Sequence, residues 1–193
     1  MPHRLLSVNV SLAREVEIGG RKVMTGIGKL PTTQAVAVKP LGLERDEQAD
    51  LSVHGGLSKA VYAYPSEHYP FWQTVRAQAK VALWDEALPP GAMGENLTIT
   101  GLLENQAWIG DVLRFPSCEL AVSEPRFPCF KFNAAMGFPQ ASKLMVANGW
   151  CGFYLAVRVA GTLQAGERFE LIPGPREVGI QELFRSRLAA QKR

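Results

Sequence analysis

The sequence predicts a mainly β protein, a barrel or a sandwich of eight or nine short strands with two or three short helices. Strand-like runs of apolar and alternating residues lie at residues 5–10, 34–38, 60–64, 96–100, 112–115, 118–122, 152–160 and 168–172. Eighteen glycines and 13 prolines supply many tight turns, which suit short strands better than long helices. Helical periodicity is confined to three short segments.

The clearest helical segment follows the strand at residues 60–64. One helix face there carries four side chains, those of His68, Trp72, Val75 and Ala79. Ser66 is in position to cap this helix, and Pro70 is compatible with it only in the first turn. We therefore expect the helix to begin directly after Ser66.

Two further helices are expected towards the C-terminus. One covers residues 140–147 and ends at an Asn-Gly pair, and the other covers residues 181–190. The Pro-Gly-Pro sequence at 173–175 separates the last helix from the strands. The predicted organisation is one domain over residues 1–173 and a short helical appendage over residues 174–193.

The composition argues against several classes of protein. The net charge of +3 is too small and too dispersed for direct nucleic-acid binding. No apolar run approaches the roughly 20 residues of a membrane span, and the N-terminus lacks the apolar core of a signal peptide. Three cysteines at irregular spacing indicate neither a disulfide framework nor a zinc site. We therefore expect a cytoplasmic protein that binds neither membrane nor nucleic acid.

The segment best suited to chemistry is residues 123–131, SEPRFPCFK. Its two prolines stiffen the loop and keep it out of a central strand, so Cys129 is expected in a rigid, accessible turn. Arg126 and Lys131 flank this cysteine and favour its thiolate, the form that acts as a nucleophile or binds soft or high-valent metals. The alternative is an inert buried cysteine, which is how we interpret Cys118 and Cys151.

A glycine-rich turn at residues 24–31, MTGIGKLP, is a candidate phosphate-binding loop. Thr25 contributes a hydroxyl and Lys29 a cation, and the two glycines allow close approach of the backbone to a ligand. Because glycine-rich turns between strands are common, a purely structural turn is the alternative.

Residues 48–62 contain a polar cluster, Asp50, His54 and Lys59, ahead of a buried strand. The glycine pair that follows His54 favours a turn with positive φ. Two interpretations stand. Either the cluster lies at the mouth of a pocket, or His54 is a simple surface residue of a turn.

Residues 94–98, GENLT, form a further candidate site. A glycine followed by two polar residues at the entry to a strand can direct the Asn96 amide, or a backbone N–H, at a bound ligand. The alternative is a capped turn with no ligand.

In this order, these segments resemble the MOSC domain, and most closely its YiiM-like branch. Each motif is short, but the ordered set is specific and spans most of residues 4–172. The matching stretches are residues 8–10, 25–27 with Lys29 and Pro31, 48–51, 54–56, 60–64, 67–69, 94–98, 110–111, 125–126 with 128–129 and Lys131, and 165–166.

The resemblance implies a barrel of mixed parallel and antiparallel strands, of the pyruvate-kinase-barrel type, that binds the molybdenum cofactor. In that cofactor a pterin dithiolene with a terminal phosphate holds the metal. In related enzymes a loop cysteine ligates the metal, and Cys129 stands at the matching position. Candidates for holding the pterin and its phosphate are Thr25, Lys29, Asn96, Arg126 and Lys131.

The activity implied by the resemblance is the two-electron reduction of N-hydroxylated compounds, such as amidoximes and the base analogue 6-hydroxylaminopurine. His54 or Asp50 is then a candidate for delivering a proton to the departing oxygen. No flavin, haem or iron–sulfur motif lies in this chain, so a separate flavin or iron–sulfur reductase is the expected electron donor. The oligomeric state stays open, with a homodimer as one option.

Two alternatives from other functional classes also stand. MOSC domains occur at the end of molybdenum-cofactor sulfurases, so the second hypothesis is a carrier, without turnover, of the cofactor or of a persulfide on Cys129. The third is a non-redox barrel that binds a phosphate-bearing ligand.

Two features depart from the YiiM-like pattern. Residues 43–46 read LERD, so Arg45 stands where many members have glycine, which retains Asp46 but puts the local turn in question. Only 18 residues follow Pro175, too few for the three-helix C-terminal extension that is usual in that branch. We expect one helix there, or two at most.

Overall fold

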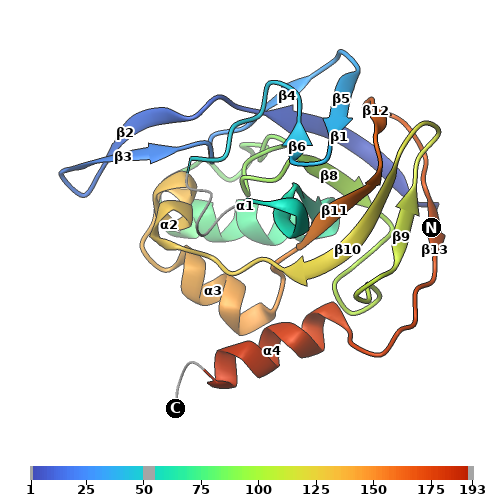
Figure 1. Cartoon of the computed structure of the whole chain (residues 1–193). Coiled ribbons are helices and arrows are strands. Elements are labelled where there is room, and N and C mark those ends of the chain that lie inside the picture. Colours follow the sequence, from blue (N-terminus) through green and yellow to red (C-terminus); the bar gives the residue numbers. More distant parts are fainter. Residues whose placement is uncertain (1, 50–54, 191–193) are drawn as a thin grey trace.

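Figure 1 shows the computed structural model of the chain, which describes residues 2–49 and 55–190. The strands are β1 (Arg4–Val10), β2 (Arg14–Ile18), β3 (Arg21–Thr25), β4 (Leu30–Thr32), β5 (Val36–Lys39), β6 (Gly42–Leu43), β7 (Val61–Pro65), β8 (Leu97–Thr100), β9 (Val112–Arg114), β10 (Glu119–Pro125), β11 (Phe153–Val159), β12 (Gly161–Leu163) and β13 (Glu170–Ile172). The 3₁₀ helices are η1 (Leu57–Lys59) and η2 (Ser66–His68), and the α-helices are α1 (Tyr69–Gln78), α2 (Phe130–Met136), α3 (Ala141–Asn148) and α4 (Ile180–Ala190).

Eight strands form one mixed sheet in the order β13–β9–β10–β11–β7–β8–β1–β4. Neighbouring strands of this sheet run antiparallel, except that β7 and β8 are parallel, with Ala63 paired to Leu97. The mainly β, mixed-sheet prediction is therefore confirmed. β1 also meets the chain just before β13, where the Leu5 N–H donates to the Glu167 carbonyl at 2.8 Å. A closed barrel stays a prediction, because β13 and β4 are the outermost strands of the sheet.

Each of the eight predicted strand segments coincides with a strand of the structure, and sequence reasoning missed the exposed hairpin strands β2 and β3 and the short strands β4, β6 and β12. The hairpin of β2 and β3 is largely exposed and projects from the body of the fold (Figure 1). Its turn is Gly19-Gly20, both with positive φ. Because neither strand buries a continuous apolar face, the hairpin has no alternating pattern for the sequence to reveal.

The core is organised around β7, whose five residues are all buried. This strand lies between β11 and β8 in the main sheet, and α1 packs against it through Trp72. The Trp72 indole N–H donates to the Tyr64 hydroxyl at 2.7 Å, and its ring meets Phe132 of α2 edge-on at 5.5 Å. One buried tryptophan thus joins the sheet to two helices.

The three predicted helices are found as α1, α3 and α4, and α2 is an additional helix directly after Cys129. The expected cap on α1 was wrong: Ser66 begins η2, and His68 occupies the N-cap without a side-chain hydrogen bond. Pro70 does lie in the first turn of the helix. Backbone N–H groups there have no acceptor within the helix, so proline loses no helical hydrogen bond. Within the described residues, no helix combines the length and apolar character that crossing a membrane requires.

The C-terminal segment packs against the rest of the fold. Phe184 of α4 is buried, and a β-bridge pairs Gly179 with Trp108. In Figure 1 this helix lies below β10 and α3. The division into a domain of residues 1–173 and an appendage of residues 174–193 stays a prediction.

Replacing Tyr64 with Phe is expected to lower the free energy of unfolding by about 1–3 kcal/mol, because the buried Trp72 N–H loses its acceptor. Urea denaturation followed by tryptophan fluorescence measures the change. The control is Thr74→Ala, which removes an exposed hydroxyl and should cost less than about 0.5 kcal/mol. Equal midpoints for the two variants would contradict the role given to this hydrogen bond.

Candidate functional site

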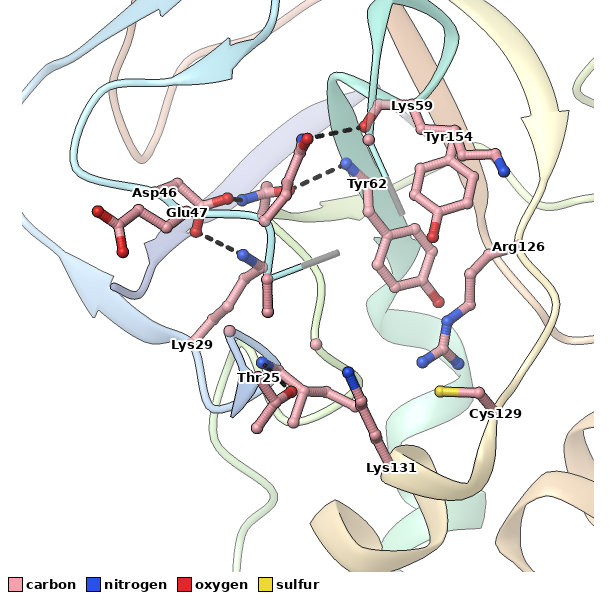
Figure 2. Close-up of a pocket in the computed structure, with 17 residues that line it drawn as sticks. Thr25, Lys29, Asp46, Glu47, Lys59, Tyr62, Arg126, Cys129, Lys131 and Tyr154 are labelled. Carbon is pink, nitrogen blue, oxygen red and sulfur yellow. Dashed lines mark hydrogen bonds and ion pairs between the residues drawn. The ribbon is translucent and has the colours of Figure 1, made fainter. Parts of the chain in front are cut away.

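A pocket opens between the turn after β3, the segment 46–49, strands β7 and β11, and the loop after β10 (Figure 2). The cavity between these segments has a volume of about 100 Å³. The ionisable side chains that line it, among the described residues, combine cations, carboxylates, phenols and a thiol: Lys29, Lys59, Arg126, Lys131, Asp46, Glu47, Tyr62, Tyr154 and Cys129. These groups make the pocket a site for a polar or charged ligand.

Cys129 ends the loop that follows β10 and occupies the N-cap position of α2. Its backbone is extended, with φ −118° and ψ 175°, as is usual for the residue before a helix. The residue is partly exposed, and its sulfur points into the pocket close to Arg126 (Figure 2). The structure thus brings together the three residues that the sequence grouped by spacing, because Arg126, Cys129 and Lys131 all line this pocket.

Arg126 is buried, with 5% of the residue exposed. Its guanidinium carbon lies 5.3 Å from the centre of the Tyr62 ring and 4.8 Å from that of Phe132, and Nη1 donates to the Met145 sulfur at 3.3 Å. Burial lowers the pKa of this group, but Tyr62 and other nearby acidic groups raise it, and the net shift is upward. No carboxylate of the described residues forms an ion pair with this cation, so the site favours an anionic ligand.

A hydrogen-bonded network forms another wall and contains two predicted ligand residues, Lys29 and Asn96. The Lys29 side chain is 8% exposed, and its ammonium is paired with the Asp46 carboxylate. The other Asp46 oxygen accepts from Asn96 Nδ2 at 2.9 Å, and Asn96 Oδ1 accepts from the Tyr62 N–H at 3.1 Å. These groups therefore have partners in the protein itself, which the sequence did not reveal.

Thr25 and Lys131 form the side of the pocket nearest the β2–β3 hairpin. Thr25 Oγ1 accepts the backbone N–H two residues further on at 3.2 Å, and Lys131 Nζ donates to a carbonyl of β3 at 3.0 Å. Gly26 allows a close approach, since a Cβ there would lie 2.4 Å from the Glu47 carbonyl oxygen. The glycine-rich turn thus packs against the protein's own chain while lining the pocket.

The two candidate proton donors, Asp50 and His54, lie outside the described residues. Ala49 and Gly55, which flank this segment, both line the pocket. Lys59, the third residue of the predicted polar cluster, also lines it. The proton-donor role of Asp50 and His54 stays a prediction.

Two tyrosines of the pocket were missed by sequence reasoning. Tyr62 on β7 and Tyr154 on β11 are paired across the two strands, with ring centroids 5.4 Å apart. Burial raises the pKa of Tyr154 more than the neighbouring Arg126 lowers it, so its phenol stays protonated. In the sequence both look like ordinary strand residues, and only the strand register places them together.

Arg45, which replaces a glycine of the family pattern, adopts a positive φ of 63°. This left-handed conformation favours glycine, yet the turn is retained with arginine in it. Arg45 donates to the Gln34 side chain at 3.1 Å, and Asp46 still reaches the pocket. The departure from the pattern therefore leaves the pocket wall intact.

The fold and the site define a mixed-sheet protein with a cation-lined pocket built around a loop cysteine. Residues 50–170 match the MOSC domain, and the chain belongs to the MOSC family.

Its relatives agree with this assignment. YflK of Bacillus subtilis is 38% identical over 96% of this chain and 80% of its own length, and YiiM of Escherichia coli is 35% identical over 82% and 68%. A Gibberella moniliformis protein named Reductase is 31% identical over 96% of this chain, which spans 33% of that protein. The crystal structure of YiiM from Geobacillus stearothermophilus has a TM-score of 0.76 and 28% identity, covering 100% of this chain and 87% of that one. The resemblance to YiiM is therefore confirmed.

Iodoacetamide at about pH 8 is expected to label Cys129 before Cys118 and Cys151, because only exposed thiols that form the thiolate react. Burial raises the pKa of the Cys118 thiol to about 12 and that of Cys151 well above its ordinary value. Mass spectrometry of tryptic peptides measures the order of labelling. Labelling of either buried cysteine at the rate of Cys129 would contradict the burial described here.

Proposed function

We propose that this protein is a molybdenum-cofactor-dependent reductase of N-hydroxylated compounds, with Cys129 as the metal ligand. The observation that carries the proposal is one pocket that holds a partly exposed thiol and the buried guanidinium of Arg126, which has no carboxylate partner among the described residues. Membership of the MOSC family and similarity to a fungal protein named Reductase support it.

The residues of the pocket fit this cofactor by their chemistry. A thiolate is a favourable ligand for a soft or high-valent metal, and cations stabilise an anionic pterin dithiolene with its phosphate. Cys129 offers the thiolate, and Arg126, Lys131 and Lys59 offer positive charge in the same pocket. When bound, the cofactor would supply the two-electron redox chemistry.

The chain's own part in the reaction is binding, orientation and proton supply. Reduction of an N–OH group to an amine consumes two electrons and two protons and releases water. Tyr62 and Tyr154 provide an aromatic wall for a flat substrate, and the protonated Tyr154 phenol can donate a hydrogen bond. In this proposal Asp50 or His54 delivers the proton to the departing hydroxyl.

The proposal requires an electron donor in another protein, a flavin or iron–sulfur reductase, because the chain carries no motif for either group. It also places the protein in the reducing cytoplasm, where Cys129 is maintained as a thiol.

Cys129→Ser is expected to reduce turnover of benzamidoxime by at least about a hundredfold, because a hydroxyl replaces the thiolate ligand. The assay is anaerobic reduction with reduced methyl viologen, using full-length protein whose molybdenum content has been quantified. Cys118→Ala is the matched control, since Cys118 is buried away from the pocket, and it should retain activity. Full activity of Cys129→Ser would overturn the proposal.

A partly exposed cysteine in a cationic pocket also suits the second candidate function, a carrier of the cofactor or of a persulfide. Bound molybdenum without turnover on several N-hydroxylated compounds would favour the carrier. Intact-mass spectrometry would then show a labile adduct of one sulfur atom on Cys129. Protein that contains no molybdenum, after expression in a host that makes the cofactor, would favour a non-redox site for a phosphate-bearing ligand.

Arg126→Met is expected to change ligand binding and stability in opposite directions. Bound molybdenum should fall by about tenfold or more, because the pocket loses its buried cation. The free energy of unfolding should stay the same or rise by up to about 2 kcal/mol, since a charge without a carboxylate partner among the described residues is no longer buried among aromatic rings. Metal analysis and urea denaturation measure the two effects. A large loss of stability would contradict the view that the Arg126 charge lacks a carboxylate partner.

A further inference from the structure

The C-terminal helix α4 contacts the loop that carries Arg126 and Cys129. Phe184 of α4 is fully buried and stacks on Phe127, with ring centroids 4.9 Å apart and an interplanar angle of 28°. Phe127 directly follows Arg126 and lies two residues before Cys129. A stacked aromatic pair therefore links this helix to the thiol and to the buried guanidinium.

A second contact of α4 is ionic and reaches the pocket through another segment. Arg187 Nη1 lies 3.2 Å from Glu124 Oε2, at the end of β10. The other Glu124 oxygen accepts from Ser58 Oγ at 3.0 Å, and Glu124 also lies 4.0 Å from Lys59 Nζ. Its side chain is 16% exposed, so one largely buried carboxylate joins α4, β10 and η1.

The strand pairing of the main sheet is irregular in this part of the chain. The pairing of β10 with β11 shifts register between Val122 and Glu124, which marks a bulge just before the loop. The contacts of α4 fall at Glu124 and at Phe127, one at the end of the strand and one beyond it. Helix α4 therefore holds the chain where the ladder becomes irregular and ends.

From these contacts we infer that α4 is a positioning element of the pocket. Phe184 and Arg187 hold the Cys129 loop and η1 in the arrangement that accepts the ligand. A loop fixed in advance loses less conformational entropy when it binds, so this support increases affinity. The identity of the ligand rests on the proposed function, whereas the link between α4 and the loop does not.

The test compares Phe184→Ala with Ile180→Ala in the full-length protein. Both residues are fully buried on α4. Ile180, however, is at the start of the helix, where its N–H donates a hydrogen bond to the Ala107 carbonyl. In cofactor-free protein, Phe184→Ala is expected to raise the rate at which iodoacetamide labels Cys129 by about tenfold. The rate of backbone hydrogen exchange in residues 123–131 should rise as well. Both variants should lower the melting temperature by a similar amount. Ile180→Ala, however, should change the labelling rate and the exchange rate by less than about twofold. If the alanine variant does not fold, Phe184→Leu is expected to give a smaller change of the same sign.

The ionic contact has its own matched pair, Arg187→Gln and Arg185→Gln. Arg185 is an exposed arginine of the same helix. Because the contact with Glu124 is partly exposed, Arg187→Gln should raise the labelling rate by only about two- to fivefold, and Arg185→Gln should leave it unchanged.

The outcomes separate this inference from the proposed function. Equal effects of Phe184→Ala and Ile180→Ala on labelling and exchange would mean that α4 acts only through overall stability, and would overturn the inference. Selective loosening by Phe184→Ala supports it, even if no form of the protein binds molybdenum. In that case the proposed function fails and the positioning role stands. If molybdenum is bound, its content should fall by about tenfold in Phe184→Ala and not in Ile180→Ala.

Discussion

The guanidinium of Arg126 is buried between the rings of Tyr62 and Phe132. The arrangement of the pocket depends on how the fold accommodates this buried charge. Strand β7 supplies the tyrosine and α2 supplies the phenylalanine, so a strand and a helix meet at this cation. Aromatic faces offset part of the cost of removing a cation from water, but they bring no full negative charge. An arginine does not lose its proton at physiological pH, so this guanidinium is positive under all such conditions.

The opposite wall has the contrasting arrangement. There the Lys29 ammonium is neutralised by Asp46, and that carboxylate also receives the Asn96 amide. The pocket therefore combines a neutral, hydrogen-bonded wall with a cationic end that carries the thiol. An anionic group of a ligand is stabilised more strongly beside Arg126 than beside the neutralised Lys29–Asp46 pair, so this contrast favours one orientation of the ligand.

Local features of the sequence were enough to predict eight of the thirteen strands in the described residues, and the position of Cys129. Alternation reveals a strand that buries one face, and two prolines with two flanking cations distinguish Cys129 from the other cysteines. The partners of Lys29 and Asn96 were not accessible in this way, because Asp46 lies 17 residues from one and 50 from the other. Such pairs depend on how the strands are registered, and the same holds for the two pocket tyrosines. The polar β2–β3 hairpin and the seven-residue α2 are too exposed or too short to leave a periodic signal.

The hydrogen bond from Lys131 to the Met24 carbonyl joins residues 107 positions apart, and the Asn9 amide reaches the Glu95 carbonyl across 86. Contacts of such long sequence separation form late, because the intervening chain must first be brought together. On the ribosome, the walls of the pocket can assemble only after β11 has emerged, when most of the chain has been synthesised. Until then Cys129 is an ordinary thiol on an unfinished chain, with no cation held beside it. The pocket can therefore accept a ligand only after translation is nearly complete.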